Sequence, residues 1–245
     1  MPGSLIIASI IGVDGCKGGW LSIARELDSG EISAEVLPTI GGLLKQKPLP
    51  LVAAIDIPIG LTDAGPRRCD RLARQMLGRP RASSVFPAPI RPALAAKNRQ
   101  EANEITRSVD GRGVGAHAWN LYSRIREVDR VLTDNHWARR FLYEVHPEVS
   151  FLGWRGGWTG GAAIAQSKKS VEGAFIRTKL VDEHFGKQAR SEIRAGHPRS
   201  LVADDDINDA FAALWTADRI RVGHAQVTPN PPEIDSLGIG MGIWY

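Results

Sequence analysis

The sequence has little cysteine and no long apolar run, and each absence argues against a class of protein. Its 245 residues include only Cys16 and Cys69, and neither lies in a CxxC or other zinc-binding spacing. This favours two reduced thiols over a disulfide scaffold or a zinc site. No stretch reaches the roughly 18 apolar residues that a membrane helix needs. The run Leu5–Val13 is short, lacks a basic leader and ends in Asp14, which indicates a buried strand rather than a signal peptide. We therefore expect a cytoplasmic protein with no membrane partner.

Common motifs of nucleotide-dependent and hydrolytic enzymes are also missing. Residues 12–19 are rich in glycine but lack the Lys-Ser/Thr ending of a phosphate-binding loop, and no G-x-G-x-x-G fingerprint is present. No Ser-His-Asp set shows a recognisable spacing. These absences argue against a P-loop enzyme, a dinucleotide-binding domain and a serine hydrolase.

Charge is weak overall but uneven along the chain. The net charge is +4, with 43% hydrophobic and 24% charged residues, an ordinary globular mixture. Between Pro66 and Arg99, however, nine Lys or Arg residues stand against a single acid, Asp70. Such a local excess can neutralise phosphates. A solvated basic face would give the same pattern, so both interpretations stay open.

Hydrophobic periodicity predicts five strands and five helices. The strands are separated by turn signals or by helical segments. They are expected at Leu5–Asp14, Trp20–Glu26, Ile32–Leu37, Leu51–Ile57 and Arg139–Val145. The helices are expected at Ile40–Gln46, Pro66–Gly78, Ala116–Leu132, Phe175–His184 and Asp204–Arg221.

This order of elements predicts an α/β fold with a mixed sheet and helices on its faces. The first three strands form an antiparallel meander, and the first and fourth strands lie side by side and parallel at the centre. Because no repeat or linker is visible, we expect one domain over residues 1–245. A helical and irregular insertion at about 61–115 follows the fourth strand.

Two of the buried strands end in an acid, Asp14 and Asp56. Isolated buried carboxylates are costly, and two neighbouring ones repel each other unless a cation lies between them. Ligand sites in α/β sheets lie beyond the carboxyl ends of the strands. The placement therefore favours a hard, oxygen-liganded cation such as Mg²⁺ or Mn²⁺, although Asp14 before a glycine could also be a simple turn former.

The helix beginning at Asp204 supplies further acids. Asp206 and Asp209 are three residues apart and share one face, while Asp204 and Asp205 are better explained as capping residues. The small side chains of Ala210, Ala212 and Ala213 would let the helix approach the sheet closely. Carboxylates from two strands and one helix make a two-metal site for phosphodiester hydrolysis plausible.

The sequence resembles the DUF429 family of predicted ribonuclease H-like nucleases. The matching motifs are GVDGCKGGW (12–20), DIPIGL (56–61), RRCDRLAR (67–74), SSVFPAP (83–89), AWNLYSRIREVD (118–129), YEVHPEVSF (143–151), QSKKSVEG (166–173) and DDDINDAFAALWTA (204–217). The resemblance implies a ribonuclease H-like five-stranded sheet of order 3-2-1-4-5, flanked by helices. It also implies a metal-dependent nuclease, because resolvases of that superfamily carry acids where Asp14, Asp56, Asp206 and Asp209 stand. The long insertion departs from the small resolvases and leaves the substrate class open.

The segment E-V-H-P-E at the end of the fifth strand adds two candidates. Alternation places Glu144 and His146 on one face of the strand. Glu144 is a candidate catalytic residue, and His146 could complete a metal shell, transfer a proton or bind substrate. A hydrogen-bonded strand end before a proline turn would explain the same residues.

Basic and hydroxyl residues near these acids could bind the substrate backbone. The candidates are Lys17, Arg67, Arg68, Arg71, Ser167, Lys168 and Lys169. Residues 153–161 are rich in glycine and predict a mobile loop on which Trp154 and Trp158 could stack on bases or pack inward.

The sequence therefore predicts a Mg²⁺- or Mn²⁺-dependent nuclease that acts on RNA or DNA by a two-metal mechanism. One alternative is a phosphotransferase of the actin-like ATPase and sugar kinase type, although 245 residues are few for its two domains. Another is a catalytically silent nucleic-acid-binding protein that keeps the acids for stability. The oligomeric state is open, with a homodimer as one option.

Overall fold

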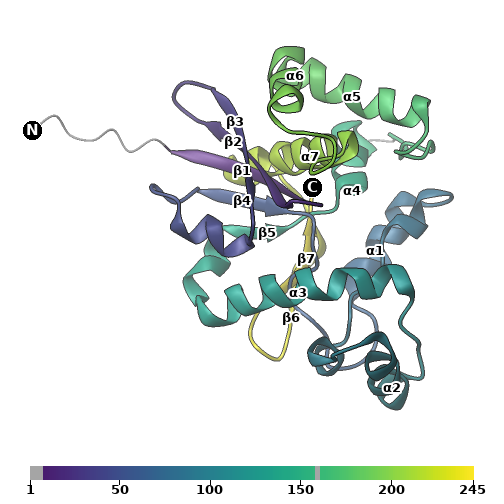
Figure 1. Cartoon of the computed structure of the whole chain (residues 1–245). Coiled ribbons are helices and arrows are strands. Elements are labelled where there is room, and N and C mark those ends of the chain that lie inside the picture. The colour runs from purple at the N-terminus through teal and green to yellow at the C-terminus, as the bar shows by residue number, and fades with distance from the viewer. Residues whose placement is uncertain (1–7, 158–160) are drawn as a thin grey trace, which may run out of the picture.

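A mixed sheet of five strands lies at the centre of the chain (Figure 1), in the order β3-β2-β1-β4-β5. The computed structural model describes residues 8–157 and 161–245. The strands are β1 (Ser9–Cys16), β2 (Gly19–Glu26), β3 (Ile32–Leu37), β4 (Val52–Ile55) and β5 (Leu142–Glu144). The predicted order is confirmed, and residues 5–7 of the predicted first strand lie outside the described residues.

Strand directions place three carboxyl ends at one edge of the sheet. β1 pairs with β2, and β2 with β3, in antiparallel fashion, whereas β1–β4 and β4–β5 are parallel. Parallel neighbours need a crossover connection, and the chain makes a long one between β4 and β5. The arrangement is α/β and consistent with the ribonuclease H-like fold. In α/β sheets, ligand sites lie beyond the carboxyl ends of the strands, which here is the edge where β1, β4 and β5 end.

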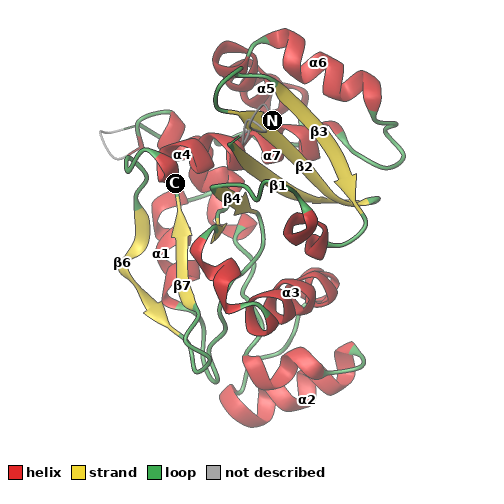
Figure 2. Cartoon of the chain, turned by 90° about the vertical axis from the view of Figure 1, so that its left-hand side faces the viewer, coloured by secondary structure: helices red, strands yellow, loops and turns green. Residues whose placement is uncertain are grey.

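Helices cover both faces of the sheet (Figure 2). On one face, α3 packs through Ile125, Val128 and Leu132 against side chains of β1 and β4. On the other face lies α7, with α5 and α6 beyond it. The larger helices around the sheet are α3 (Ala116–Asp134), α4 (Pro147–Trp154), α5 (Val171–Phe185), α6 (Lys187–Gly196) and α7 (Asp204–Arg221). Short 3₁₀ turns are η1 (Ile40–Lys45) and η4 (His136–Arg140).

The helix α7 lies unusually close to β1, and a glycine makes this approach feasible. A Cβ atom on Gly12 would lie 2.2 Å from both the Ala210 carbonyl oxygen and the Leu214 nitrogen. Only a residue without a side chain fits against that backbone. The expected close approach through the small residues of the helix is therefore matched by glycine on the strand, and it brings the acidic start of α7 to the edge of the sheet.

An insertion follows β4, as predicted. It contains α1 (Arg68–Leu77), η2 (Arg81–Ser84), η3 (Arg91–Ala95) and α2 (Arg99–Asp110). Helix α1 was expected from the sequence, but α2 was not. The insertion has its own small apolar clusters, one around Cys69, Ala73 and Leu77 and another around Ala102 and Ile90.

The chain ends in a two-stranded ribbon of β6 (Val227–Ile234) and β7 (Gly240–Trp244), which pair in antiparallel fashion. Figures 1 and 2 show the ribbon beside α1, away from the β3 edge of the sheet. None of the helices in the described part of the chain is both long and apolar enough to span a membrane.

Candidate functional site

Asp14 and Asp56 lie side by side because β1 and β4 are parallel neighbours. Val13 pairs with Ile55, and the Asp56 N–H donates to the Val13 carbonyl oxygen at 3.0 Å. Val13 and Ile55 point into the apolar cluster on the α3 side. Since side chains alternate along a strand, the next residues, Asp14 and Asp56, belong to the face that α7 covers.

Helix α7 adds a third carboxylate, Asp209, which is 1% exposed. One of its oxygens, Oδ2, accepts a hydrogen bond from the Lys168 ammonium group. The other oxygen, Oδ1, is buried and has no hydrogen-bond partner among the described residues. We call Asp14, Asp56 and Asp209, together with Lys168, the aspartate cluster. It joins segments of chain that are far apart in the sequence.

Burial and mutual repulsion dominate the electrostatics of the aspartate cluster. Burial raises the pKa of Asp14 well above its usual range, and the carboxylates of Asp209 and Asp56 raise it further. Burial also raises the pKa of Asp56, against the opposing effect of His146 and Lys168. The pKa of Asp209 is raised to about 6 by burial, even though Lys168 lowers it. The cluster therefore favours binding of additional positive charge.

The remaining acids of α7 have partners of their own. Asp206 Oδ2 accepts a hydrogen bond of 2.8 Å from the Ala203 N–H, which caps the helix, yet its charge still contributes to the raised pKa of Asp14. Asp205 lies 3.3 Å from Lys168 and 2.7 Å from Lys169. Both lysines thus contact acids of α7, a role that their assignment as phosphate ligands did not include.

A second acidic cluster is built around Arg67. Among residues 8–157 and 161–245, one set of three candidate metal ligands has all its ligand atoms within 4.8 Å of one another: Cys69, Asp70 and Glu144. The Arg67 guanidinium binds this set, at 2.5 Å from Asp70 and 2.7 Å from Glu144. We call Arg67, Asp70 and Glu144 the arginine-centred cluster, and an arginine already supplies its cation.

This arrangement corrects the expected role of Arg67. The sequence interpretation placed it with Arg68 and Arg71 on a face that follows a nucleic-acid backbone. The side chain of Arg67 is instead only 1% exposed, and the residue immediately precedes α1. Burial by itself would lower its pKa, but Asp70 and Glu144 raise the pKa well above the usual range. Arg67 is therefore a permanent internal cation.

Glu144 is likewise enclosed. It accepts hydrogen bonds from Arg67 and, at 2.7 Å, from the Ile59 N–H. Burial raises its pKa to about 7, against the lowering effect of Arg67. Glu144 lines the pocket described below, and its predicted catalytic role stays a prediction. Its contacts with Arg67 and Ile59 hold the insertion against β5.

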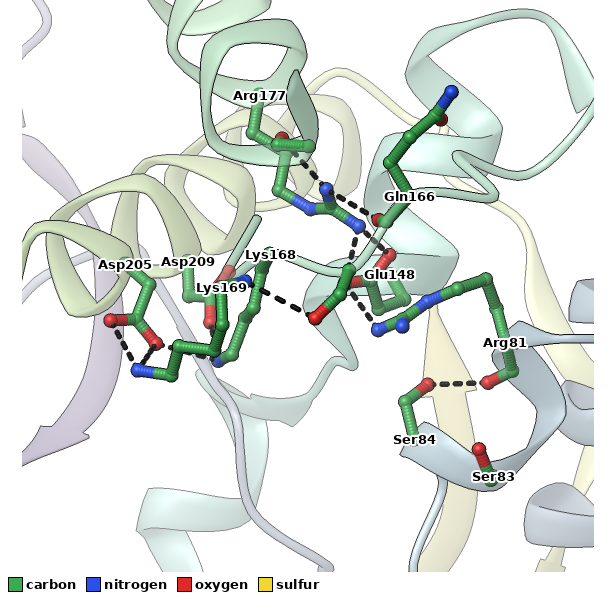
Figure 3. A network of polar contacts seen from close by, with 12 residues as sticks. Arg81, Ser83, Ser84, Glu148, Gln166, Lys168, Lys169, Arg177, Asp205 and Asp209 are labelled. Carbon is green, nitrogen blue, oxygen red and sulfur yellow. Dashed lines mark hydrogen bonds and ion pairs between the residues drawn. The ribbon is translucent and has the colours of Figure 1, made fainter. Parts of the chain in front are cut away.

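A buried ion pair, which the sequence interpretation missed, joins α4 to α5. Both Glu148 oxygens accept hydrogen bonds of 2.7 Å from Arg177, and Arg81 lies 3.2 Å from the same carboxylate (Figure 3). Glu148 belongs to the EVHPE segment, but nothing in the periodicity of α5 marks Arg177 as a buried residue. The pair fixes α5 and the preceding loop, which carries Lys168, next to the sheet edge.

Much of the basic excess between Pro66 and Arg99 serves such internal contacts. Five of its nine cations bind partners within the protein. They are Arg67, Arg68, Arg74, Arg81 and Arg91. Arg71 is exposed, as is Lys17 in the turn after β1. Roles of Lys17, Arg68 and Arg71 in substrate binding stay predictions.

A pocket of about 360 Å³ opens between the insertion and the sheet edge. Predicted site residues contribute much of its lining: Asp56, Arg67, Glu144, His146, Ser167, Lys168, Lys169 and Asp209. His146 Nε2 lies 3.3 Å from the Ser84 carbonyl oxygen, and its Nδ1 is buried without a hydrogen-bond partner among the described residues. The pocket therefore reaches from the aspartate cluster to the insertion.

Of the two roles that the sequence left open for Trp154, the structure shows inward packing. Trp154 ends helix α4, and its ring stacks on Trp215 at 5.2 Å and on Phe151 at 5.9 Å. It is part of the packing between α4 and α7 and does not lie in a loop. Trp158 lies outside the described residues.

The donors of the aspartate cluster fit a hard divalent cation. All are carboxylate oxygens, which Mg²⁺ and Mn²⁺ prefer, and the unpartnered Asp209 Oδ1 is free to serve as a ligand. The carboxylates of Asp14, Asp56 and Asp209 would hold such an ion, with Asp206 beside them. The Lys168 ammonium group competes for the same oxygens.

One comparison with known proteins gives a match. The family model for DUF429, described as "Protein of unknown function (DUF429)", matches residues 12–234. No curated protein and no solved structure matches this chain significantly.

Proposed function

The chain belongs to the DUF429 family, and from this membership and the geometry above we propose that it is a divalent-metal-dependent nuclease. Asp14, Asp56 and Asp209 bind Mg²⁺ or Mn²⁺, and Asp206 completes the set of ligands. The observation that carries the proposal is the meeting of three carboxylates, from β1, from the residue after β4 and from α7. Asp14 and Asp209 are buried and Asp56 is half-buried, and one Asp209 oxygen has no partner among the described residues.

The ligand chemistry supports phosphodiester hydrolysis. Two divalent ions about 4 Å apart lower the pKa of a bound water and stabilise the leaving oxygen. Lys168 and Lys169 line the same pocket and place positive charge where a phosphate would approach.

Neutralising the carboxylates one at a time tests the proposal. Asp14→Asn, Asp56→Asn and Asp209→Asn should each lower Mn²⁺-dependent cleavage by about 10³-fold, since each removes a charged ligand worth several kcal/mol to the transition state. The assay uses a panel of single-stranded and double-stranded RNA and DNA. Asp28→Asn is the matched control, because Asp28 is exposed in the turn between β2 and β3.

Full cleavage by all three Asn variants, or no cleavage by the wild type on any member of the panel, would refute the proposal. Titration calorimetry with Mn²⁺ gives a readout independent of activity. The wild type and Asp28→Asn should bind Mn²⁺, and Asp56→Asn should bind it at least tenfold more weakly.

One observation favours a second candidate, a catalytically silent nucleic-acid-binding protein. Lys168 already places an ammonium group on Asp209 and near Asp205, and a permanent internal cation would make a metal unnecessary. This candidate predicts no Mn²⁺ binding by calorimetry and unchanged nucleic-acid binding in Asp56→Asn. The phosphotransferase alternative predicts thermal stabilisation by ATP with Mg²⁺, which the same preparations can test.

A further inference from the structure

The lining of the pocket beside the aspartate cluster combines two kinds of side chain. Asp56, Asp209 and Lys168 supply charge, and we call them the charged wall. Val85 and Phe86 of the insertion and Pro58 of the loop after β4 are apolar, and we call them the apolar wall, although the insertion also supplies charged residues such as Arg81. A ligand with both a charged part and a flat, apolar part would match this lining.

Phe86 is the distinctive group of the apolar wall. It belongs to the segment after η2 and is 43% exposed, although large apolar side chains are usually buried. Its ring lies 6.1 Å from that of His117, at an interplanar angle of 28°. The fold thus keeps an aromatic face at a pocket that is also lined by five acids and by Lys168 and Lys169.

Hydrogen-bonding groups lie between the two walls. The Nδ1 atom of His146 is buried and unpartnered within the described part of the chain, and the Ser84 side chain also lines the pocket. Small-molecule sites combine such a few polar groups with a largely apolar lining. A nucleobase needs both an aromatic or apolar face to stack on and polar groups at its edge.

We propose that this pocket takes one unpaired nucleotide of a single strand, with its base on Phe86 and its phosphate at the aspartate cluster. The inference rests on the proposed nuclease function and names its substrate class. The strand enters as a free end, a loop or an extruded nucleotide.

The size of the pocket favours a single nucleotide over a base-paired substrate at this position. About 360 Å³ is near the lower end of the range of about 300–1,000 Å³ that small-molecule sites occupy. A duplex is much larger, since its major groove alone is about 12 Å wide. The insertion contributes Arg81, Ser84 and Phe86 to the lining of this pocket.

Equilibrium binding with Ca²⁺ in place of Mg²⁺ or Mn²⁺ tests the inference, because Ca²⁺ also takes carboxylate oxygens and the readout is binding and not cleavage. The probes are three DNAs that contain the fluorescent base 2-aminopurine: a single-stranded octamer, a blunt duplex, and a duplex with one extrahelical 2-aminopurine. We expect the octamer and the extrahelical probe to be quenched on binding. Their Kd should be at least tenfold lower than that of the blunt duplex.

Substitution of Phe86 ties this preference to the pocket. Phe86→Ala should raise the Kd of the octamer about tenfold and leave the duplex unchanged, and Phe86→Trp should restore octamer binding. Phe175→Ala is the matched control, because Phe175 is 65% exposed on α5 and lies outside the pocket lining.

Equal affinity for the octamer and the blunt duplex, or an unchanged octamer Kd in Phe86→Ala, would overturn the inference. Adenosine monophosphate that binds as tightly as the octamer would also overturn it, since the ligand would then be a free nucleotide. A failure of this inference can be distinguished from a failure of the proposed nuclease function. Metal-dependent cleavage without strand preference removes only this inference, whereas strand preference without cleavage removes only the nuclease.

Discussion

The aspartate cluster and the arginine-centred cluster are both largely buried groups of acids, but only in the arginine-centred cluster does every carboxylate oxygen accept a hydrogen bond. Arg67 donates to both oxygens of Glu144 and to both oxygens of Asp70. The aspartate cluster has three carboxylates against one lysine, whose side chain is 34% exposed, and one carboxylate oxygen without a partner. A planar guanidinium fixes two carboxylates, whereas a flexible ammonium group can move away.

We propose that this difference separates a structural cluster from a functional one. The arginine-centred cluster connects β5 to the insertion through contacts that satisfy every carboxylate oxygen, as buried ion pairs must. The aspartate cluster leaves repulsion unrelieved, and such strained polar groups collect at functional sites because the ligand provides the missing interaction. Close packing of candidate ligands alone would point to the other cluster, since Cys69, Asp70 and Glu144 have ligand atoms within 4.8 Å of one another.

Removal of Arg67 should have the largest effect on stability. Arg67→Met leaves Asp70 and Glu144 buried without their cation, and breaking a buried pair in this way costs about 3–5 kcal/mol. Urea unfolding at pH 7 measures the loss. Arg68→Met is the control, because its side chain is 53% exposed and such surface changes stay within about 0.5 kcal/mol.

The comparison predicts the opposite result in the aspartate cluster. Asp209→Asn removes a repelling charge and should leave the free energy of unfolding unchanged or higher, while it abolishes Mn²⁺ binding. If Asp209→Asn cost as much stability as Arg67→Met, the distinction between the two clusters would fail.

Gly12→Ala should have the next largest effect, because it separates the strand and helix that bring Asp14 and Asp209 together. The added Cβ would lie 2.2 Å from backbone atoms of α7, so the helix must move. Overpacking of this kind typically lowers the free energy of unfolding by about 1–3 kcal/mol. Because the added atom meets rigid backbone, we expect a loss of about 3 kcal/mol for Gly12→Ala.

Urea unfolding and Mn²⁺ calorimetry measure the consequences of Gly12→Ala, and both stability and metal affinity should fall together. Gly196→Ala, at the end of α6, meets no atom within 4 Å and should be neutral or slightly stabilising. Loss of stability in Gly12→Ala with full Mn²⁺ affinity would show that the cluster does not depend on the close approach of α7.

Local sequence signals predicted the strands and the acids that end them. An apolar run that stops in Asp indicates both a buried strand and a carboxylate at its end, so Asp14 and Asp56 could be found without coordinates. The small residues of α7 indicated that the helix lies near the sheet. The connections between elements predicted the meander of the first three strands and the central pair of the first and fourth, whereas the place of the fifth strand came only from the family resemblance.

Partner choice among charged residues could not be predicted. Arg67, Arg68 and Arg71 follow one another at helical spacing, yet Arg67 turns inward and the other two lie outside. What decides this is the position of Glu144, which is 77 residues away in sequence. Similarly, the glycine-rich start of 153–161 concealed the end of helix α4, because its helical character comes from packing against α7.

The pH dependence of stability offers a finer comparison. Burial raises the pKa of Asp209 from the ordinary value of 3.8 to about 6, so between these values the folded state keeps a proton that the unfolded state releases. The contribution of Asp209 to the free energy of unfolding is therefore fully present below about pH 4 and is lost as the pH rises through about 6. Its size is at most about 3 kcal/mol.

Urea unfolding from pH 4 to pH 7 without metal measures this loss as the difference between wild type and Asp209→Asn. The wild type should lose stability relative to the variant over this interval and stay level above it. Saturating Mn²⁺ at pH 7 should reverse the loss, because the ion binds the charged form. If the difference in the free energy of unfolding between wild type and Asp209→Asn did not change with pH, Lys168 alone would balance the charge of Asp209.

The smallest expected effect comes from Lys168, and it bears on whether the aspartate cluster is a metal site or a finished ion pair. Lys168→Met removes the competing ammonium group from Asp209, so Mn²⁺ should bind about tenfold more tightly, or about 1.4 kcal/mol. Lys169→Met is the matched control, since its side chain is 69% exposed and contacts only Asp205 among the acids of α7. Calorimetry compares the three proteins. If Lys168→Met instead abolished Mn²⁺ binding and unfolded at lower urea, Lys168 would be the cation for which these carboxylates are arranged, as Arg67 is in the other cluster.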